Sequence, residues 1–345
     1  MSLQNPLVSV VMPVYNADEY LAEAIDSILA QTFRDFEFII ICDDASDKTH
    51  KIIDNYQKTD DRIKVFYQKR EGLVASLNKG CSVAKGKYIA RMDADDISLL
   101  QRFEKQISFL ERHQNIGIIG TWVNNISDDG SLLKQINKLP TSPNVLRYFL
   151  HFFSPLAHPS IMMRRRIFEK FGPYNVDALH AEDYELWSRI ASDTDFSNIP
   201  EVLLKYRVHK KSISGEFKNT QNDQAYKTKF FLINKLLNGS VDAKDIMMLH
   251  DWQKLKKISA LYQVDVIDSL IHRIFCRVLE KNNLNTEELL EIKYYHLMFL
   301  FELAISTKNI SLIATIKIIY KMMNENFRIS IKIYFQFLKK ILLKF

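Results

Sequence analysis

The sequence feature that most constrains the fold is a short apolar run that ends in clustered acids. Residues 88–92 follow a glycine turn and have the composition of a β-strand, and Asp93, Asp95 and Asp96 come directly after them. Apolar side chains then recur at helical spacing, which predicts a helix that begins at Ser98. A strand that delivers acids at its carboxyl end, followed by a helix, places those acids where open α/β sheets bind ligands. We therefore predict an α/β fold with an acidic site at this edge.

Two interpretations of the three acids are open at this point. Carboxylates this close together repel one another, and their oxygens suit a hard divalent cation such as Mn²⁺ or Mg²⁺, which in turn can hold a diphosphate. The alternative is a solvated acidic loop that caps the following helix. The stretch alone does not separate a metal site from a helix cap.

The same pattern occurs twice earlier in the chain. Residues 7–12 and 36–42 are β-prone runs, and each is followed by a segment with apolar residues at helical spacing. Alternating strands and helices are typical of a parallel sheet with right-handed crossovers. Parallel strands bring their carboxyl ends to one edge, so the side chains there should line one cleft, which favours the ligand site. The residues at these two strand ends are Pro13, Tyr15, Asn16, Asp43 and Asp44.

A second informative stretch lies at Glu182 and Asp183, directly before an apolar helical pattern. The helix dipole favours charged carboxylates in the first turn, which suits a general base that must stay ionised. Ordinary N-terminal charge decoration is the alternative. Further along, residues 157–163 have the composition of a strand, and His209 follows another strand-like run and precedes two lysines. There, a metal or phosphate contact and an exposed basic loop are both open.

The character of the chain changes near residue 221, where Gly and Pro nearly vanish. Apolar periodicity predicts helices around 230–237, 264–279, 287–305 and 312–323. We expect two domains, an α/β domain over 1–220 and an all-α region over 221–345. The last segment, 329–345, has four lysines and no acid. It resembles an interfacial amphipathic helix for peripheral membrane contact, and packing on the helical region through the same face is the alternative.

Charge and cysteine content narrow the class of protein. The net charge of +6 suits an anionic ligand or membrane surface, but it is too small to indicate nucleic acid. Three scattered cysteines without a C-x-x-C pair predict free thiols in a reducing compartment. Neither a signal peptide nor an apolar run of membrane-spanning length is seen. We expect a cytoplasmic protein that can work at the inner face of the cell membrane.

Seven short motifs follow one another along the chain. They are VSVVMPVYN at 8–16, SILAQTF at 27–33, CDDAS at 42–46, DADD at 93–96, HPS at 158–160, Glu182-Asp183 and YRVH at 206–209. In this order they resemble family 2 inverting glycosyltransferases, over about the first two-thirds of the chain. The resemblance implies a GT-A fold, in which a nucleotide-binding half and an acceptor-binding half form one domain. It also implies transfer of a sugar from a nucleotide-diphospho-sugar donor.

Residue roles follow from this resemblance, position by position. It implies that Pro13, Tyr15 and Asp44, together with the adjoining Asn16, bind the nucleotide. Tyr15 would stack on the base, and Asp44 would accept from a uracil-type ring N–H. Asp93 would contact the ribose or the sugar, and Asp95 would hold Mn²⁺ or Mg²⁺. The candidate base is Asp183, with Glu182 as the alternate, and His209 is a further metal or phosphate contact.

The predicted function is therefore metal-dependent, non-processive transfer of a sugar to a hydroxyl of a glycan or lipid-linked acceptor in cell-surface polysaccharide synthesis. The expected donor is a UDP-sugar. Guanine remains open as the donor base. The Q-x-x-R-W pattern of processive synthases is missing, and Leu77 stands where many relatives have Arg. A sugar nucleotidyltransferase is one alternative, although residues 13–17 lack the Gly-rich basic loop that it needs. A non-catalytic nucleotide-sugar-binding protein is the other.

Overall fold

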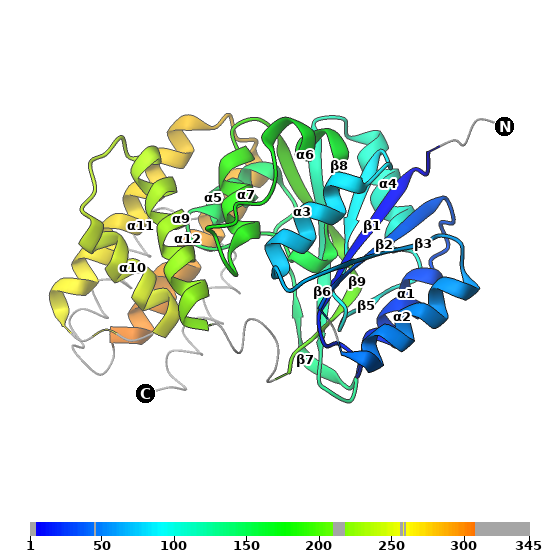
Figure 1. Ribbon diagram of the computed structural model, residues 1–345. Coiled ribbons are helices and arrows are strands. Elements are labelled where there is room, and N and C mark those ends of the chain that lie inside the picture. Colours follow the sequence, from blue (N-terminus) through cyan, green and yellow to red (C-terminus); the bar gives the residue numbers. More distant parts are fainter. Residues whose placement is uncertain (1–4, 45, 210–217, 256–257, 259, 308–345) are drawn as a thin grey trace. The chain divides into compact units, whose positions relative to one another are not determined.

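The computed structural model describes residues 5–44, 46–209, 218–255, 258 and 260–307. The chain divides into two compact units (Figure 1). The first unit comprises residues 1–146 together with 154–225, and the second comprises 147–153 together with 226–345. The residues of the predicted site all belong to the first unit.

The first unit is built on one sheet with the strand order β3-β2-β1-β4-β8-β6-β9-β5, and β7 pairs with β6 at the side (Figure 1). β1 runs parallel to β2 and β4, and β2 runs parallel to β3. β8 is antiparallel to both β4 and β6. The strands are β1 (Val8–Val14), β2 (Phe36–Asp43), β3 (Ile63–Gln68), β4 (Tyr88–Arg91), β5 (Ile97–Ser98), β6 (Ile116–Ile126), β7 (Leu132–Asn137), β8 (Met162–Arg164) and β9 (Asp195–Arg207).

Helices connect and cover these strands in the alternation that the sequence predicts. The first unit contains α1 (Leu21–Leu29), α2 (Asp47–Thr59), α3 (Leu73–Val83), α4 (Arg102–Arg112), α6 (Arg165–Phe171), α7 (Glu182–Ile190) and the 3-10 turn η1 (His158–Ser160). Both faces of β1 and β2 are buried, as in parallel sheets with helices on both sides. This confirms the predicted α/β class with a mostly parallel sheet.

The two faces of the sheet pack differently. One face of β1, which includes Val10 and Met12, joins a core cluster with apolar residues of α1, α2 and α4. On the other face α3 lies against β1 and β2. A methyl group on Gly80 of α3 would lie only 2.4 Å from the Val11 side chain, so this close helix–sheet contact requires glycine. The close packing fixes α3 against the sheet.

Two local predictions were wrong. Ser98 does not begin a helix, because it lies in β5 and pairs with Leu204 of β9, and α4 starts only at Arg102. The Gln31 side chain donates to the Ser98 hydroxyl, which ties β5 to the end of α1. The predicted strand at 157–163 is instead η1 followed by β8, since Pro159 favours a turn over ladder pairing.

The second unit is helical. Its helices are α9 (Lys218–Leu236), α10 (Ala243–Leu255), α11 (Leu261–Lys281) and α12 (Thr286–Thr307), with the first residues of α9 in the first unit and the last residues of α5 (Pro143–Leu150) in the second. The rings of Phe149, Phe152 and Phe299 pack together within this unit. The sequence did not predict α10. No described helix is long and apolar enough to cross a membrane. The predicted helix at 312–323 and the basic segment 329–345 lie outside the described residues.

Candidate active site

The carboxyl ends of β1, β2 and β4 meet at one edge of the sheet, because these strands are parallel neighbours. Tyr15 and Asn16 follow β1 and are exposed, and Asp44 follows β2 and is also exposed. Pro13 lies inside β1 opposite Ile41 and is half-buried. The structure therefore brings the four predicted nucleotide-binding residues of these strand ends to one edge.

Two of these residues adopt a backbone conformation that side chains rarely take. Asn16 has φ 44° and Asp44 has φ 54°, both in the left-handed region. The Asn16 side-chain amide oxygen accepts from the backbone N–H of Ser46 at 3.0 Å, and the Asp44 backbone N–H donates to the Gln68 backbone carbonyl at 3.0 Å. These bonds join the loops after β1, β2 and β3 into what we term the three-loop platform. Unfavourable backbone of this kind concentrates at ligand sites.

Asp43 and Asp44 have different roles although they are neighbours. The Asp43 side chain is buried and accepts from the Gln68 amide at 2.8 Å and from the N–H groups of Glu71 and Gly72 at 2.9 and 2.8 Å. It fastens the loop after β3 to the end of β2. The exposed Asp44 carboxylate is the one that a ligand can reach.

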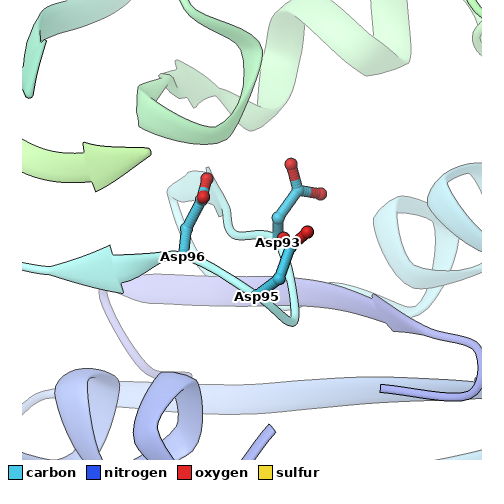
Figure 2. A group of neighbouring side chains, drawn as sticks. All are labelled: Asp93, Asp95 and Asp96. Carbon is cyan, nitrogen blue, oxygen red and sulfur yellow. The ribbon is translucent and has the colours of Figure 1, made fainter. Parts of the chain in front are cut away.

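Asp93, Asp95 and Asp96 follow β4 as a tight cluster. Each residue offers an oxygen, and these oxygens lie within 4.8 Å of one another. Figure 2 shows the three side chains on one side of the turn that leads from β4 to β5. Asp93 and Asp95 are partly exposed, while Asp96 is buried. Oxygen donors at this spacing fit a hard divalent cation.

A buried arginine offsets part of this negative charge. Arg91, the last residue of β4, is 5% exposed and its guanidinium lies 2.5 Å from the Asp93 carboxylate. Burial nevertheless raises the pKa of Asp93 to about 6, with Arg91 opposing the shift. Burial and the charges of its two neighbours raise the pKa of Asp96. Both shifts show that ionising these carboxyls is costly in this environment.

The end of β9 reaches the same cluster. The His209 Nε2 atom lies 2.9 Å from an Asp95 carboxylate oxygen, which supports the predicted association of these two residues. The Arg207 N–H donates to the Asp96 carboxylate at 2.8 Å, and its guanidinium donates to the Asp95 carbonyl at 2.8 Å and to Glu23 at 2.5 Å. Arg207 thereby fixes the strand end that presents His209.

Glu182 and Asp183 begin α7, as the sequence predicts, but their environments differ. Glu182 is 4% exposed and lies 3.6 Å from His158 Nδ1, whereas Asp183 is partly exposed and accepts from the Ser154 hydroxyl at 3.1 Å. Burial, aided by the Asp183 charge, raises the pKa of Glu182 to about 7, and burial raises the pKa of Asp183. The His158 ring also contacts the Tyr174 hydroxyl at 3.2 Å.

Arg91 connects the two acidic groups. Its positive charge lowers the pKa of Asp93 on one side and of Glu182 and Asp183 on the other, against the larger effect of burial. Asp93 and Glu182 also repel each other. Such interactions require proximity, so the cluster after β4 and the start of α7 lie near one another.

The sequence analysis missed the two buried arginines of this site. Arg91 was treated only as part of a strand, and Arg207 only as a member of the YRVH motif without a role of its own. A charged residue inside an otherwise apolar strand, next to an acid, was the available signal for Arg91. Nothing in the local sequence indicated that Arg207 contacts Glu23.

Comparison with known proteins identifies the family. Residues 9–172 match the family model described as glycosyl transferase family 2. An uncharacterized glycosyltransferase of Methanocaldococcus jannaschii is 41% identical over 212 residues, which cover 60% of this chain and 72% of the relative. The chain belongs to glycosyl transferase family 2. The O-antigen biosynthesis glycosyltransferase WbnJ of Escherichia coli is 35% identical over 210 residues, covering 60% of this chain and 81% of that protein.

Solved structures show that this family 2 glycosyltransferase has the GT-A fold. The mannosyltransferase PcManGT from Pyrobaculum calidifontis, in complex with GDP-Man and Mn²⁺, superposes with a TM-score of 0.54 at 16% identity, over 94% of this chain and 89% of that chain. S. aureus TarS 1–349 in complex with UDP-GlcNAc superposes with a TM-score of 0.53 at 13% identity, over 87% of this chain and 83% of that chain. The predicted family, fold and enzyme class are thus confirmed.

Proposed function

We propose that this glycosyltransferase catalyses inverting, non-processive transfer of a sugar from a nucleoside diphosphate to a hydroxyl of a glycan or lipid-linked acceptor. The proposal rests on one observation above all. Arg91 lies within electrostatic reach of both the acid cluster after β4 and the acids that begin α7. The proposed leaving-group site and the candidate base therefore lie near one buried arginine in the first unit.

The three-loop platform is the proposed donor site. The exposed Tyr15 ring offers a stacking surface for a base, and the exposed Asp44 carboxylate can accept a hydrogen bond from a ring N–H. The GDP-Man and UDP-GlcNAc named for the solved structures above are donors of this class. We propose UDP as the carrier here, since a uracil ring N–H matches the acceptor oxygens of Asp44.

The residues after β4 fit a divalent cation. Asp95 and His209 are the proposed ligands, with Asp93 placed to contact the ribose or the sugar. When bound, Mn²⁺ or Mg²⁺ supplies Lewis-acid neutralisation of the charge on the leaving diphosphate. The chain itself contributes the buried Arg91 and Arg207, which hold the carboxylates of Asp93 and Asp96 in place.

Asp183 is the proposed base. Its carboxylate takes the proton of the acceptor hydroxyl as that oxygen bonds to the anomeric carbon. The bond from the anomeric carbon to the diphosphate oxygen breaks at the same time, and the bonding pair leaves with the nucleoside diphosphate. Attack from the face opposite the leaving group converts an α-linkage into a β-linkage. A position in the first turn of α7 favours the ionised carboxylate that this role needs.

Glu182 is less suited to be the base. Its carboxyl is 4% exposed and faces His158, whereas Asp183 is partly exposed. A group that takes a proton from an acceptor must come within hydrogen-bond reach of it. We therefore assign Asp183 to proton transfer and Glu182 to the buried support of α7.

Polysaccharide synthesis is the proposed context. The similarity to an O-antigen biosynthesis glycosyltransferase supports an acceptor that is a growing glycan on a carrier. In this proposal residues 1–220 form the catalytic domain, and residues 221–345 form a helical region that contacts a membrane or a partner.

The test uses donor turnover, so that the acceptor need not be known. The purified chain is supplied with UDP- and GDP-sugars and Mn²⁺, and release of nucleoside diphosphate is measured. We expect turnover of at least one donor, and a loss of at least about 100-fold in Asp183→Asn, since general bases contribute about 10²–10⁴-fold. The matched control is Glu185→Gln, two positions further along the same helix. The Glu185 side chain forms an ion pair with Arg189.

Two results would contradict the proposal. Release of pyrophosphate from a nucleoside triphosphate and a sugar phosphate would make the chain a nucleotidyltransferase. Tight nucleotide binding without turnover of any donor, with or without glycan acceptors, would make it a binding protein.

A further inference from the structure

Arg70 lies beside the proposed donor site, and no motif of the sequence indicates it. Its guanidinium carbon lies 4.2 Å from the centroid of the Tyr15 ring. Both side chains are exposed, and Tyr15 keeps 42% of its surface. The guanidinium thus covers the aromatic face on which a base would stack.

The backbone that carries Arg70 is fixed to the three-loop platform. The two residues that follow it, Glu71 and Gly72, both donate their N–H groups to the buried Asp43 carboxylate. Gly72 has φ 89°, a conformation that favours glycine, and it precedes α3 directly. The position of the side chain over Tyr15 therefore follows from an anchored loop, while the side chain itself can move.

The Arg70 guanidinium is also available to a ligand. Within the described part of the chain its guanidinium makes no hydrogen bond or ion pair, and its one recorded partner is the Tyr15 ring. Arg91 and Arg207, by contrast, are buried and pair with Asp93 and Glu23. Leu77 of α3 is fully buried and supplies no charge.

We propose that Arg70 and Tyr15 form a clamp that binds the base of the donor between the guanidinium plane and the phenol ring. The inference rests on the proposed function, because it deepens the donor site. In the free protein the clamp is closed on itself as a cation–π pair. Entry of a base replaces this one contact by two stacking contacts, one on each face of the base.

A base is a better partner for Arg70 than a phosphate. The guanidinium is planar and lies over the ring that would stack on the base, and planarity is what distinguishes Arg from Lys at such positions. Asp44, on the adjoining loop, is then placed to meet the edge of the same base. The specificity for the carrier nucleotide would come from Asp44, and the affinity for a flat heterocycle from the clamp.

The experiment separates base from phosphate contacts with two ligands and three variants. The ligands are UDP and uridine, or GDP and guanosine if wild type prefers GDP. The dissociation constant of the diphosphate is measured by calorimetry with Mn²⁺ present, and that of the nucleoside is measured by its displacement of the diphosphate. The variants are Arg70→Ala, Arg70→Lys and the matched control Lys69→Ala. The control removes the same charge from the neighbouring exposed position of the same loop.

We expect Arg70→Ala to raise both dissociation constants by about 5–30-fold, which is about 1–2 kcal/mol at 1.4 kcal/mol per tenfold. Arg70→Lys should recover little of this loss, and Lys69→Ala should change either value less than about twofold. An unchanged nucleoside affinity in Arg70→Ala would overturn the clamp, as would full rescue by Lys or an equal loss in Lys69→Ala. If wild type binds neither diphosphate, the proposed donor site itself fails.

Discussion

Replacing Glu182 by Gln should make the first unit more stable at alkaline pH and leave its stability nearly unchanged at acidic pH. Glu182 is 4% exposed, one of its carboxyl oxygens has no hydrogen-bond partner among the described residues, and Asp183 adds a neighbouring charge. Ionising this carboxyl in the folded protein is therefore costly. Gln has nearly the same shape and carries no charge at any pH.

The magnitude and the sign follow from the pKa of Glu182. Burial raises this pKa from 4.5 to about 7. At 1.36 kcal/mol per pKa unit, the shift corresponds to about 3 kcal/mol. Because the folded pKa is raised, this contribution to stability is fully present below about pH 4.5 and is lost as the pH rises through about 7. As the pH rises through about 7, the free energy of unfolding of wild type should therefore fall by up to about 3 kcal/mol, whereas Glu182→Gln should not show this loss.

The assay is urea unfolding at pH 5 and pH 8.5, followed by tryptophan fluorescence. Trp187 is fully buried on the same helix and packs edge-on against His158, so it reports on this region. Glu185→Gln on α7 is the control, since losing a surface ion pair should cost less than about 1 kcal/mol at either pH. The free energy of unfolding should fall more between pH 5 and pH 8.5 in wild type than in Glu182→Gln. If it changes by the same amount in both proteins, the reasoning about this buried carboxyl is wrong.

Three further predictions concern the cluster, the platform and the tail. Asp95→Asn should abolish the stimulation of donor turnover by Mn²⁺, and EDTA should do the same to wild type; metal-dependent turnover that persists in the variant would contradict the assigned ligand. Asp43→Ala leaves two backbone N–H groups without their acceptor, so it should lower the free energy of unfolding by about 3 kcal/mol and weaken nucleotide binding, while the exposed Asp44→Asn changes stability by less than about 1 kcal/mol. Thermal and urea unfolding measure this, and equal effects of the two substitutions would refute it. Deleting residues 329–345 should shift the protein from anionic vesicles to the free fraction, and unchanged co-sedimentation would rule out a membrane role for this segment.

The alternation of strands and helices could be predicted because each strand of the parallel half is an apolar run of its own. Acids or turn residues at the ends of these runs sufficed to locate the edge that carries Tyr15, Asp44 and Asp93. Because parallel strands have their carboxyl ends at the same edge of a sheet, these residues could be predicted to lie together. This half of the prediction needed only local composition and one topological rule.

The errors arose where long-range pairing decides the structure. Ser98 has the composition of a helix cap, yet pairing with β9, more than 100 residues later, makes it part of a strand. Buried polar residues were also invisible in the sequence. Arg102 is fully buried and donates to the carbonyls of Arg91 and Ile161, and Gln106 donates to those of Ile119 and Ser160. Local periodicity assigns such residues to a solvated face, because it cannot show which carbonyls they will meet.

The charge balance of the site supports the proposed cation. Asp93, Asp95 and Asp96 lie together, and Glu182 lies close enough to repel Asp93. Among the residues that the structure describes, Arg91 is the one arginine or lysine whose side chain forms an ion pair with one of the three aspartates. A protein gains nothing in stability from burying unpaired carboxylates, since each ionised group out of water costs several kcal/mol.

Such an arrangement is understandable if the missing positive charge arrives with the substrate. A divalent cation is bound most strongly where carboxylates are close and only partly neutralised, and it loses that advantage if more arginines are supplied. The donor diphosphate is itself an anion, so it would be repelled by the cluster until a cation lies between them. In this proposal the acidic turn after β4 couples the two ligands, so that donor and cation are each held well only in the presence of the other. Substituting Arg for Asp96 should uncouple them, giving nucleotide binding that no longer depends on Mn²⁺, and continued dependence on Mn²⁺ in a folded variant would show that charge balance is not what governs this site.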